Sequence, residues 1–115
     1  MTESTVTLWR PVGPIEFDYI KKADFAEFPP RLPEQPIFYP VLNEEYAILI
    51  ARDWNLKLDG AGYVTEFEVK KEFLDNYEIH QVGGRTILEY WIPAEELVLF
   101  NKNIVGKIRT VREYL

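Results

Sequence analysis

The alternation of apolar and polar residues predicts strands in several parts of the chain. Residues 5–10 are rich in β-branched and aromatic side chains and stop at Pro11, which indicates a first strand that ends with Arg10. Three more segments have the composition or the alternation of strands, at residues 37–42, 63–69 and 104–111. These segments supply most of a sheet.

A glycine pair, Gly83-Gly84, separates two further strand-like segments at residues 77–82 and 85–92. Two such residues between strands are typical of a tight β-hairpin. In the register of that hairpin Glu78 would face Glu89, and the repulsion of two facing carboxylates would raise one pKa. The alternative is a pair of solvated surface carboxylates.

Helix signals occur at four places. Pro14 suits the first position of one short helix, and a helical turn is expected at residues 70–76. Asn43 is placed to cap a second helix whose residues 46–54 are apolar almost all the way round, so we expect this helix to be buried on most of its surface. Pro93 opens the last helix.

The segment Phe28–Pro36 holds four of the eight prolines, which predicts a stiff, extended loop. This proline loop would line a pocket, or serve as a rigid surface connector or a polyproline-type peptide ligand. The 115 residues are expected to form a single domain, 1–115, with residues 1–4 as a disordered tail. The fold class is α+β, with a mainly antiparallel sheet of about six strands and three or four short helices.

Composition narrows the classes of function. A hydrophobic fraction of 47% supports a packed core, and a net charge of −6 without any block of Lys or Arg disfavours binding to a nucleic-acid backbone. A small anionic ligand remains compatible, because one or two arginines suffice to hold a phosphate. The absence of cysteine excludes disulfides and thiolate chemistry. The longest apolar run, 46–51, is too short to span a membrane, so we expect a cytoplasmic protein.

Few side chains remain as candidates for chemistry. His80 is the single histidine, Ser4 is the only serine, and no glycine motif for nucleotide phosphates is present. Catalysis would therefore rest on carboxylates, arginine and tyrosine. Glu89 is the most unusual carboxylate, because it lies in an apolar strand, and Arg10 ends another apolar strand. Each is either a surface residue or a group placed for a ligand.

The aromatic residues are likewise candidates either for ligand binding or for core packing. Tyr39 and Tyr46 bracket a strand-to-helix junction, where free backbone N–H groups could also receive an anion. Core packing is the alternative for both. We expect Trp9, Trp54 and Trp91 to belong to the core.

Four segments resemble a set of short bacterial proteins commonly labelled ADP-ribosylation/crystallin J1. The segments are Leu8–Gly13, Phe28–Pro33, Phe38–Ala47 and Glu89–Leu97. The order of their elements is similar to the compact ADP-ribosyltransferase fold, whose members cleave the nicotinamide–ribose bond of NAD. The resemblance implies that NAD is the substrate and that a target would accept its ADP-ribose.

The same resemblance implies roles for five residues. Arg10 would contact the adenosine or phosphate part of NAD, with Arg31 in the same cleft. Tyr39 or Tyr46 would lie against the nicotinamide ring, and Glu89 would be the catalytic carboxylate at the ribose. That carboxylate would stabilise the positive charge that develops as nicotinamide leaves.

Two other functions stay open. The chain could be an acidic interaction protein of the antitoxin or immunity type, whose carboxylates neutralise a basic partner and which binds no NAD. It could also bind some other small ligand, with the proline loop as one wall of the site. The sequence does not choose between these functions.

Overall fold

The structure is a computed structural model that describes residues 4–85 and 87–115. It confirms an α+β fold built from antiparallel strands and short helices. Residues 1–3 of the expected tail lie outside the described residues. Ser4 is described, and its carbonyl accepts a hydrogen bond of 3.0 Å from the Lys71 N–H.

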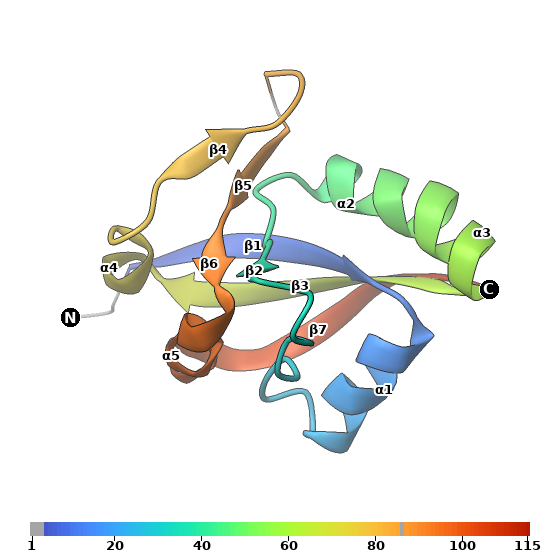
Figure 1. Ribbon diagram of the computed structural model, residues 1–115, viewed down its shortest axis with the longest axis horizontal. Helices are drawn as coiled ribbons and strands as arrows, with labels where there is room; N and C mark the ends of the chain where they lie inside the picture. The colour runs from blue at the N-terminus through green and yellow to red at the C-terminus, as the bar shows by residue number, and fades with distance from the viewer. Residues whose placement is uncertain (1–3, 86) are drawn as a thin grey trace.

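Three antiparallel strands form the centre of the molecule, in the order β1-β3-β7 (Figure 1). Their bounds are β1 (Thr5–Val12), β3 (Gly62–Lys70) and β7 (Ile104–Tyr114). The first strand continues past the expected end at Arg10, because it is an edge strand of this sheet and tolerates Pro11, which has no N–H to donate.

Two smaller antiparallel pairs complete the strands of the described chain. They are β2 (Ile37–Phe38) with β6 (Ile92–Pro93), and β4 (Ile79–Gln81) with β5 (Leu88–Tyr90). Seven strands in three small sheets thus replace the single sheet of about six strands that the sequence predicts. Strand β2 is shorter than the expected 37–42, because Pro40 cannot donate to a ladder.

The helical elements alternate with these strands. They are α1 (Pro14–Lys22), α2 (Glu44–Ile50), the π-helical turn η1 (Ala51–Asn55), α3 (Leu56–Asp59), α4 (Lys71–Leu74), the 3₁₀ turn η2 (Ala94–Glu96) and α5 (Leu97–Lys102). The predicted cap at Asn43 is confirmed, because its side chain accepts a hydrogen bond of 3.0 Å from the Tyr46 N–H. Among the described helices, none has the length and hydropathy to span a membrane.

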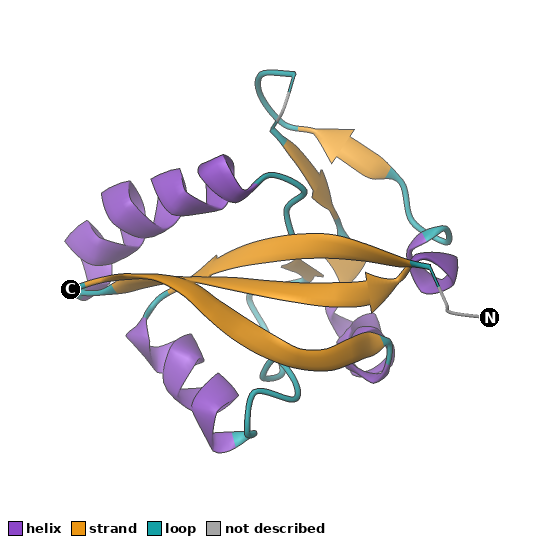
Figure 2. Cartoon of the chain, turned by 180° about the vertical axis from the view of Figure 1, so that it is seen from behind, coloured by secondary structure: helices purple, strands orange, loops and turns teal. Residues whose placement is uncertain are grey.

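The helices cover both faces of the central sheet. One face carries α2 and η1, which pack on it through Ala47 and Ala51, and the other carries α1 and α5, which pack on it through Ile20 and Phe100. In Figure 2 the helix of α2 and α3 and the helix α1 lie on opposite sides of the strands. The larger core fills the second face and contains four phenylalanines with ring centroids 4.9–6.0 Å apart, namely Phe28, Phe38, Phe67 and Phe100. A smaller core beneath α2 contains Val41, Ala47, Ala51 and Val64.

The second helix differs from its prediction in length and in burial. The sequence predicts a loop from Asn55, but α2, η1 and α3 follow one another without a break until Gly60, whose φ of +83° ends the helix. The expectation that residues 46–54 are buried on most of their surface was wrong, since Leu49 is 42% exposed and Trp54 is 61% exposed. A helix on the outside of a sheet buries only its inner stripe, here Ala47 and Ala51.

The assignment of tryptophans to the core was wrong for two of the three residues. Trp54 lies on the outer side of this helix, and Trp91 is 38% exposed beside the β4–β5 pair. Trp9 is half-buried and packs against the smaller core. The sequence pattern identified these positions as apolar. Their side chains nevertheless point outward, where no further helix or strand of the described chain buries them.

The predicted hairpin register was also wrong. Glu89 pairs with His80 and not with Glu78. The Val82 N–H donates to the Ile87 carbonyl, so the strands come together farther along the chain than a two-residue turn at Gly83-Gly84 allows. The expected pair of facing carboxylates therefore does not form.

Candidate functional site

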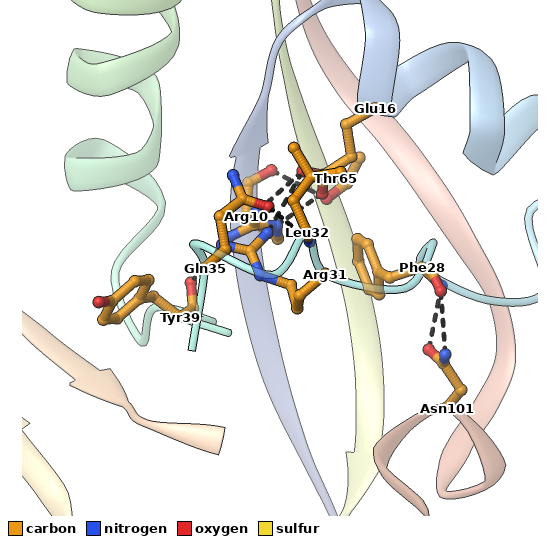
Figure 3. A network of polar contacts seen from close by, with 9 residues as sticks. All are labelled: Arg10, Glu16, Phe28, Arg31, Leu32, Gln35, Tyr39, Thr65 and Asn101. Atoms are coloured by element: carbon orange, nitrogen blue, oxygen red, sulfur yellow. Dashed lines mark hydrogen bonds and ion pairs between the residues drawn. The ribbon is translucent and has the colours of Figure 1, made fainter. Parts of the chain in front are cut away.

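Arg10 is the polar centre of the larger core (Figure 3). Strand β1 places its side chain on the same face as Leu8 and Val12, and it is only 9% exposed. Its Nε and Nη2 donate to the two carboxylate oxygens of Glu16, at 2.7 and 2.9 Å. Its Nη1 donates to the Tyr39 carbonyl at 3.4 Å. The guanidinium is thus fixed in a bidentate ion pair.

Arg31 reaches the same carboxylate from the proline loop. Its Nη1 lies 3.8 Å from Glu16 Oε1, and its side chain is 10% exposed. Both guanidinium groups also lie over the Phe38 ring, with their carbons 4.6 Å (Arg10) and 5.9 Å (Arg31) from its centroid. The buried Nε of Arg31 has no hydrogen-bond partner among the described residues.

The charges of this cluster do not balance. Burial raises the pKa of the Glu16 carboxyl, but the charge and hydrogen bonds of Arg10 and the charge of Arg31 outweigh it and hold the pKa below its ordinary value of 4.5. Burial and then the charge of Arg10 lower the pKa of Arg31, which Glu16 offsets only in part. Two guanidinium groups therefore share one carboxylate, which leaves a single excess positive charge.

A pocket of about 680 Å³ opens beside Arg31. Its walls come from α1, the proline loop, the end of η1 and α3. Its lining residues include Glu16, Arg31, Gln35, Asn55 and Asp59. The mouth carries three exposed apolar or aromatic side chains, Ile15, Tyr19 and Leu32. We call this site the proline-loop pocket.

Asn55 contributes the second unpartnered atom of the pocket. Its Oδ1 is buried and accepts no hydrogen bond from the described residues, as Arg31 Nε donates none. Buried polar groups of a native protein are nearly always paired, with protein, water or ligand. Two residues that line the pocket thus carry a buried donor and a buried acceptor without a partner among the described residues.

Glu89 belongs to a second cluster. Its side chain is 9% exposed, and its Oε1 accepts a hydrogen bond of 2.7 Å from the Trp91 indole. Burial, and then the charge of Glu89, raise the pKa of the Tyr46 hydroxyl. The indole of Trp91 also stacks on the His80 ring at 3.8 Å.

Tyr39 lies between the two clusters. Its carbonyl accepts from Arg10, and its ring stands at 89° to the Trp91 indole with centroids 6.3 Å apart. Of the five residues that the sequence singles out, Arg10 and Arg31 meet at the Glu16 carboxylate, and Arg31 also lines the proline-loop pocket. Tyr46 and Glu89 meet in the second cluster.

Backbone pairing explains this division. Trp9 pairs with Val41, and Val41 pairs with Glu89, so these three side chains lie on one side of the paired strands. Arg10 follows Trp9 in β1 and points to the other side. The structure therefore brings together two pairs of the predicted residues, on opposite sides of one layer.

Sequence reasoning missed Glu16 and Asn55. A signal for Glu16 exists, because a carboxylate in the first turn of a helix that directly follows β1 lies near the arginine of that strand. Asn55 gave no signal, since its helix was expected to end at Trp54.

Comparison with known protein families, curated proteins and solved structures finds no match to this chain. The site must therefore be interpreted from its geometry. Among residues 4–85 and 87–115, no three histidine or carboxylate side chains gather closely enough to hold a metal ion.

Proposed function

We propose that the chain binds a small molecule in the proline-loop pocket, and that the ligand is an anionic nucleotide of the ADP-ribosyl class, such as NAD. The observation that carries the proposal is that the two buried polar atoms without partners, Arg31 Nε and Asn55 Oδ1, both belong to residues of this pocket. A ligand that offers an acceptor and a donor would satisfy both.

The chemistry of the wall suits the parts of such a nucleotide. A phosphate oxygen would accept from Arg31 and neutralise the excess charge of the cluster. The exocyclic amine of adenine would donate to Asn55, and its ring would pack on Tyr19 at the mouth. The volume of about 680 Å³ lies within the range of small-molecule sites.

The proposal concerns binding in the first place. Glu89, the carboxylate that the family resemblance assigns to catalysis, does not line this pocket and accepts from Trp91 on the other side of the strands. Transfer of ADP-ribose would require the ribose to reach that carboxylate. We therefore treat release of nicotinamide as a separate measurement.

The first test is calorimetric titration of the protein with NAD and with ADP-ribose. The variant Arg31→Met removes the unpartnered donor and keeps an unbranched apolar chain, so we expect it to weaken binding about tenfold or more. Arg109→Met is the matched control, because Arg109 pairs with Glu66 at the surface and lies outside the pocket. It should bind as the unmodified protein does.

The outcomes separate the candidate functions. Binding that is equal in Arg31→Met and in the unmodified protein would remove the pocket from the proposal. Absence of binding by both nucleotides would favour the acidic interaction protein. Nicotinamide release that disappears in Glu89→Gln would extend the function from binding to transfer.

A further inference from the structure

Glu89 is a buried carboxylate without a cationic partner. Among the described residues, no lysine, arginine or histidine nitrogen lies within ion-pair distance of it. By contrast, Arg10 and Arg31 lie beside Glu16, and Arg109 lies beside Glu66 and Glu68. Its single described side-chain hydrogen bond comes from the neutral Trp91 indole. A buried charge of this kind is expected to be paired.

Aromatic side chains lie near the Glu89 carboxylate. The Trp91 indole donates to it, burial and then its charge raise the pKa of the Tyr46 hydroxyl, and the Tyr39 ring stands at right angles to the Trp91 ring. His80 covers one face of the indole by parallel stacking, and 38% of the Trp91 surface remains exposed to solvent. Aromatic faces beside a carboxylate attract cations through both the ring quadrupole and the negative charge.

We infer that Glu89, Trp91, Tyr39 and Tyr46 form a binding site for a small organic cation of the alkylammonium class. The site is distinct from the proline-loop pocket and does not depend on the function proposed for it. It is formed where the β4–β5 pair meets the segment that leads into α2.

The hydrogen bonding of Glu89 selects the type of cation. Because Oε1 already accepts from the indole, only Oε2 is free of a described partner. A guanidinium group binds a carboxylate best through two parallel hydrogen bonds, which this geometry does not offer. An ammonium is a compact charge that needs one oxygen and gains further contact from the ring faces.

Choline is the test cation, and its neutral carbon isostere dimethylbutanol is the matched ligand control. Binding would be followed by the NMR resonance of the Trp91 indole N–H, assigned with the variant Trp91→Phe. We expect choline to shift this resonance with saturation, dimethylbutanol to leave it unchanged, and methylguanidinium to bind more weakly than choline.

Glu89→Gln keeps the shape and an acceptor but removes the charge, and we expect it to weaken choline binding about tenfold or more. Glu66→Gln is the matched protein control, because Glu66 also accepts an indole N–H, from Trp9 at 3.0 Å, but is neutralised by Arg109. It should bind choline as the unmodified protein does.

Three results would overturn the inference: no saturable shift with choline, equal shifts with choline and dimethylbutanol, or equal affinity of the protein and Glu89→Gln. If Glu89→Gln does not fold, Trp91→Leu serves as the second variant, since it removes the ring and leaves the charge. Undiminished choline binding by Trp91→Leu, measured calorimetrically, would also contradict the site.

Discussion

Glu16 holds together residues from three parts of the chain. Its carboxylate binds Arg10 of β1 and lies near Arg31 of the proline loop, while its own backbone belongs to α1. A carboxylate that is mostly buried against two guanidiniums contributes more than a surface ion pair, because its removal leaves buried positive charge without compensation.

We predict that Glu16→Gln lowers the free energy of unfolding by about 3 kcal/mol at neutral pH. Asp18→Asn on the same helix removes an exposed pair with Lys22 and should change stability far less than Glu16→Gln does. Urea denaturation followed by circular dichroism measures both values. Equal effects of the two substitutions would show that the buried ion pair contributes no more to stability than the exposed one does.

The difference between the protein and Glu16→Gln should depend on pH. Because the pKa of Glu16 is lower in the folded chain than its ordinary value of 4.5, the carboxylate stabilises the fold above that value, and this contribution is lost as the pH falls through the folded-state pKa. The two stabilities should therefore converge in acid. A difference that stays constant from neutral to acidic pH would contradict this account.

At the scale of elements, β3 and the π-helical turn η1 approach each other at Gly62. A Cβ atom there would lie 2.1 Å from the Ala51 carbonyl oxygen, so no larger residue fits unless the helix moves. The close approach lets the helix lie directly on the sheet. It explains why a glycine begins the central strand.

We predict that Gly62→Ala lowers the free energy of unfolding by about 3 kcal/mol, because backbone must shift to admit the methyl group. Gly84→Ala is the control, since the nearest atom to its added Cβ would be Ile87 Cδ1 at an ordinary contact distance of 3.9 Å. Its stability should change by less than about 0.5 kcal/mol. Thermal unfolding of both variants checks the contrast, and a tolerated Gly62→Ala would refute the close approach.

Local signals predicted some elements and failed for others. The helix at Pro14, the Asn43 cap and the strand of residues 63–69 follow from side chains whose preference is local, and the structure confirms them. The hairpin register failed because it depends on where a connection closes. The predicted length of the second helix was wrong because residues 56–59 form a further helical turn, whereas Gly60 and Gly62 had indicated a loop from Asn55 onward.

On the scale of the whole molecule, both cores rest on the same three strands. The larger core contains Phe67 of β3, and the smaller core contains Val64 of the same strand. If one of these strands detaches, both cores become exposed to water. We therefore predict a single cooperative unfolding transition. Coincident urea transitions by tryptophan fluorescence and far-ultraviolet circular dichroism would support this, and separated midpoints would contradict it.

The candidate site shows the same limit of sequence reasoning. Arg10 and Glu89 were singled out as charges in apolar strands, and both are buried. Arg31, which the family resemblance alone implied, has a side chain that is 10% exposed. Their grouping was not predictable, because it depends on the bridges through Val41 that place Glu89 and Arg10 on opposite sides. Side-chain chemistry can be read locally, but which groups share a site is a property of the tertiary pairing.

The proline loop has a consequence for the thermodynamics of binding. It is held at one end by paired hydrogen bonds between the Phe28 backbone and the Asn101 side chain, and at the other by the Pro36 carbonyl, which accepts from the Ala94 N–H. Prolines also restrict the backbone between these anchors. A wall that is already ordered loses little conformational entropy when a ligand arrives, so contacts to Arg31 translate into affinity with little loss.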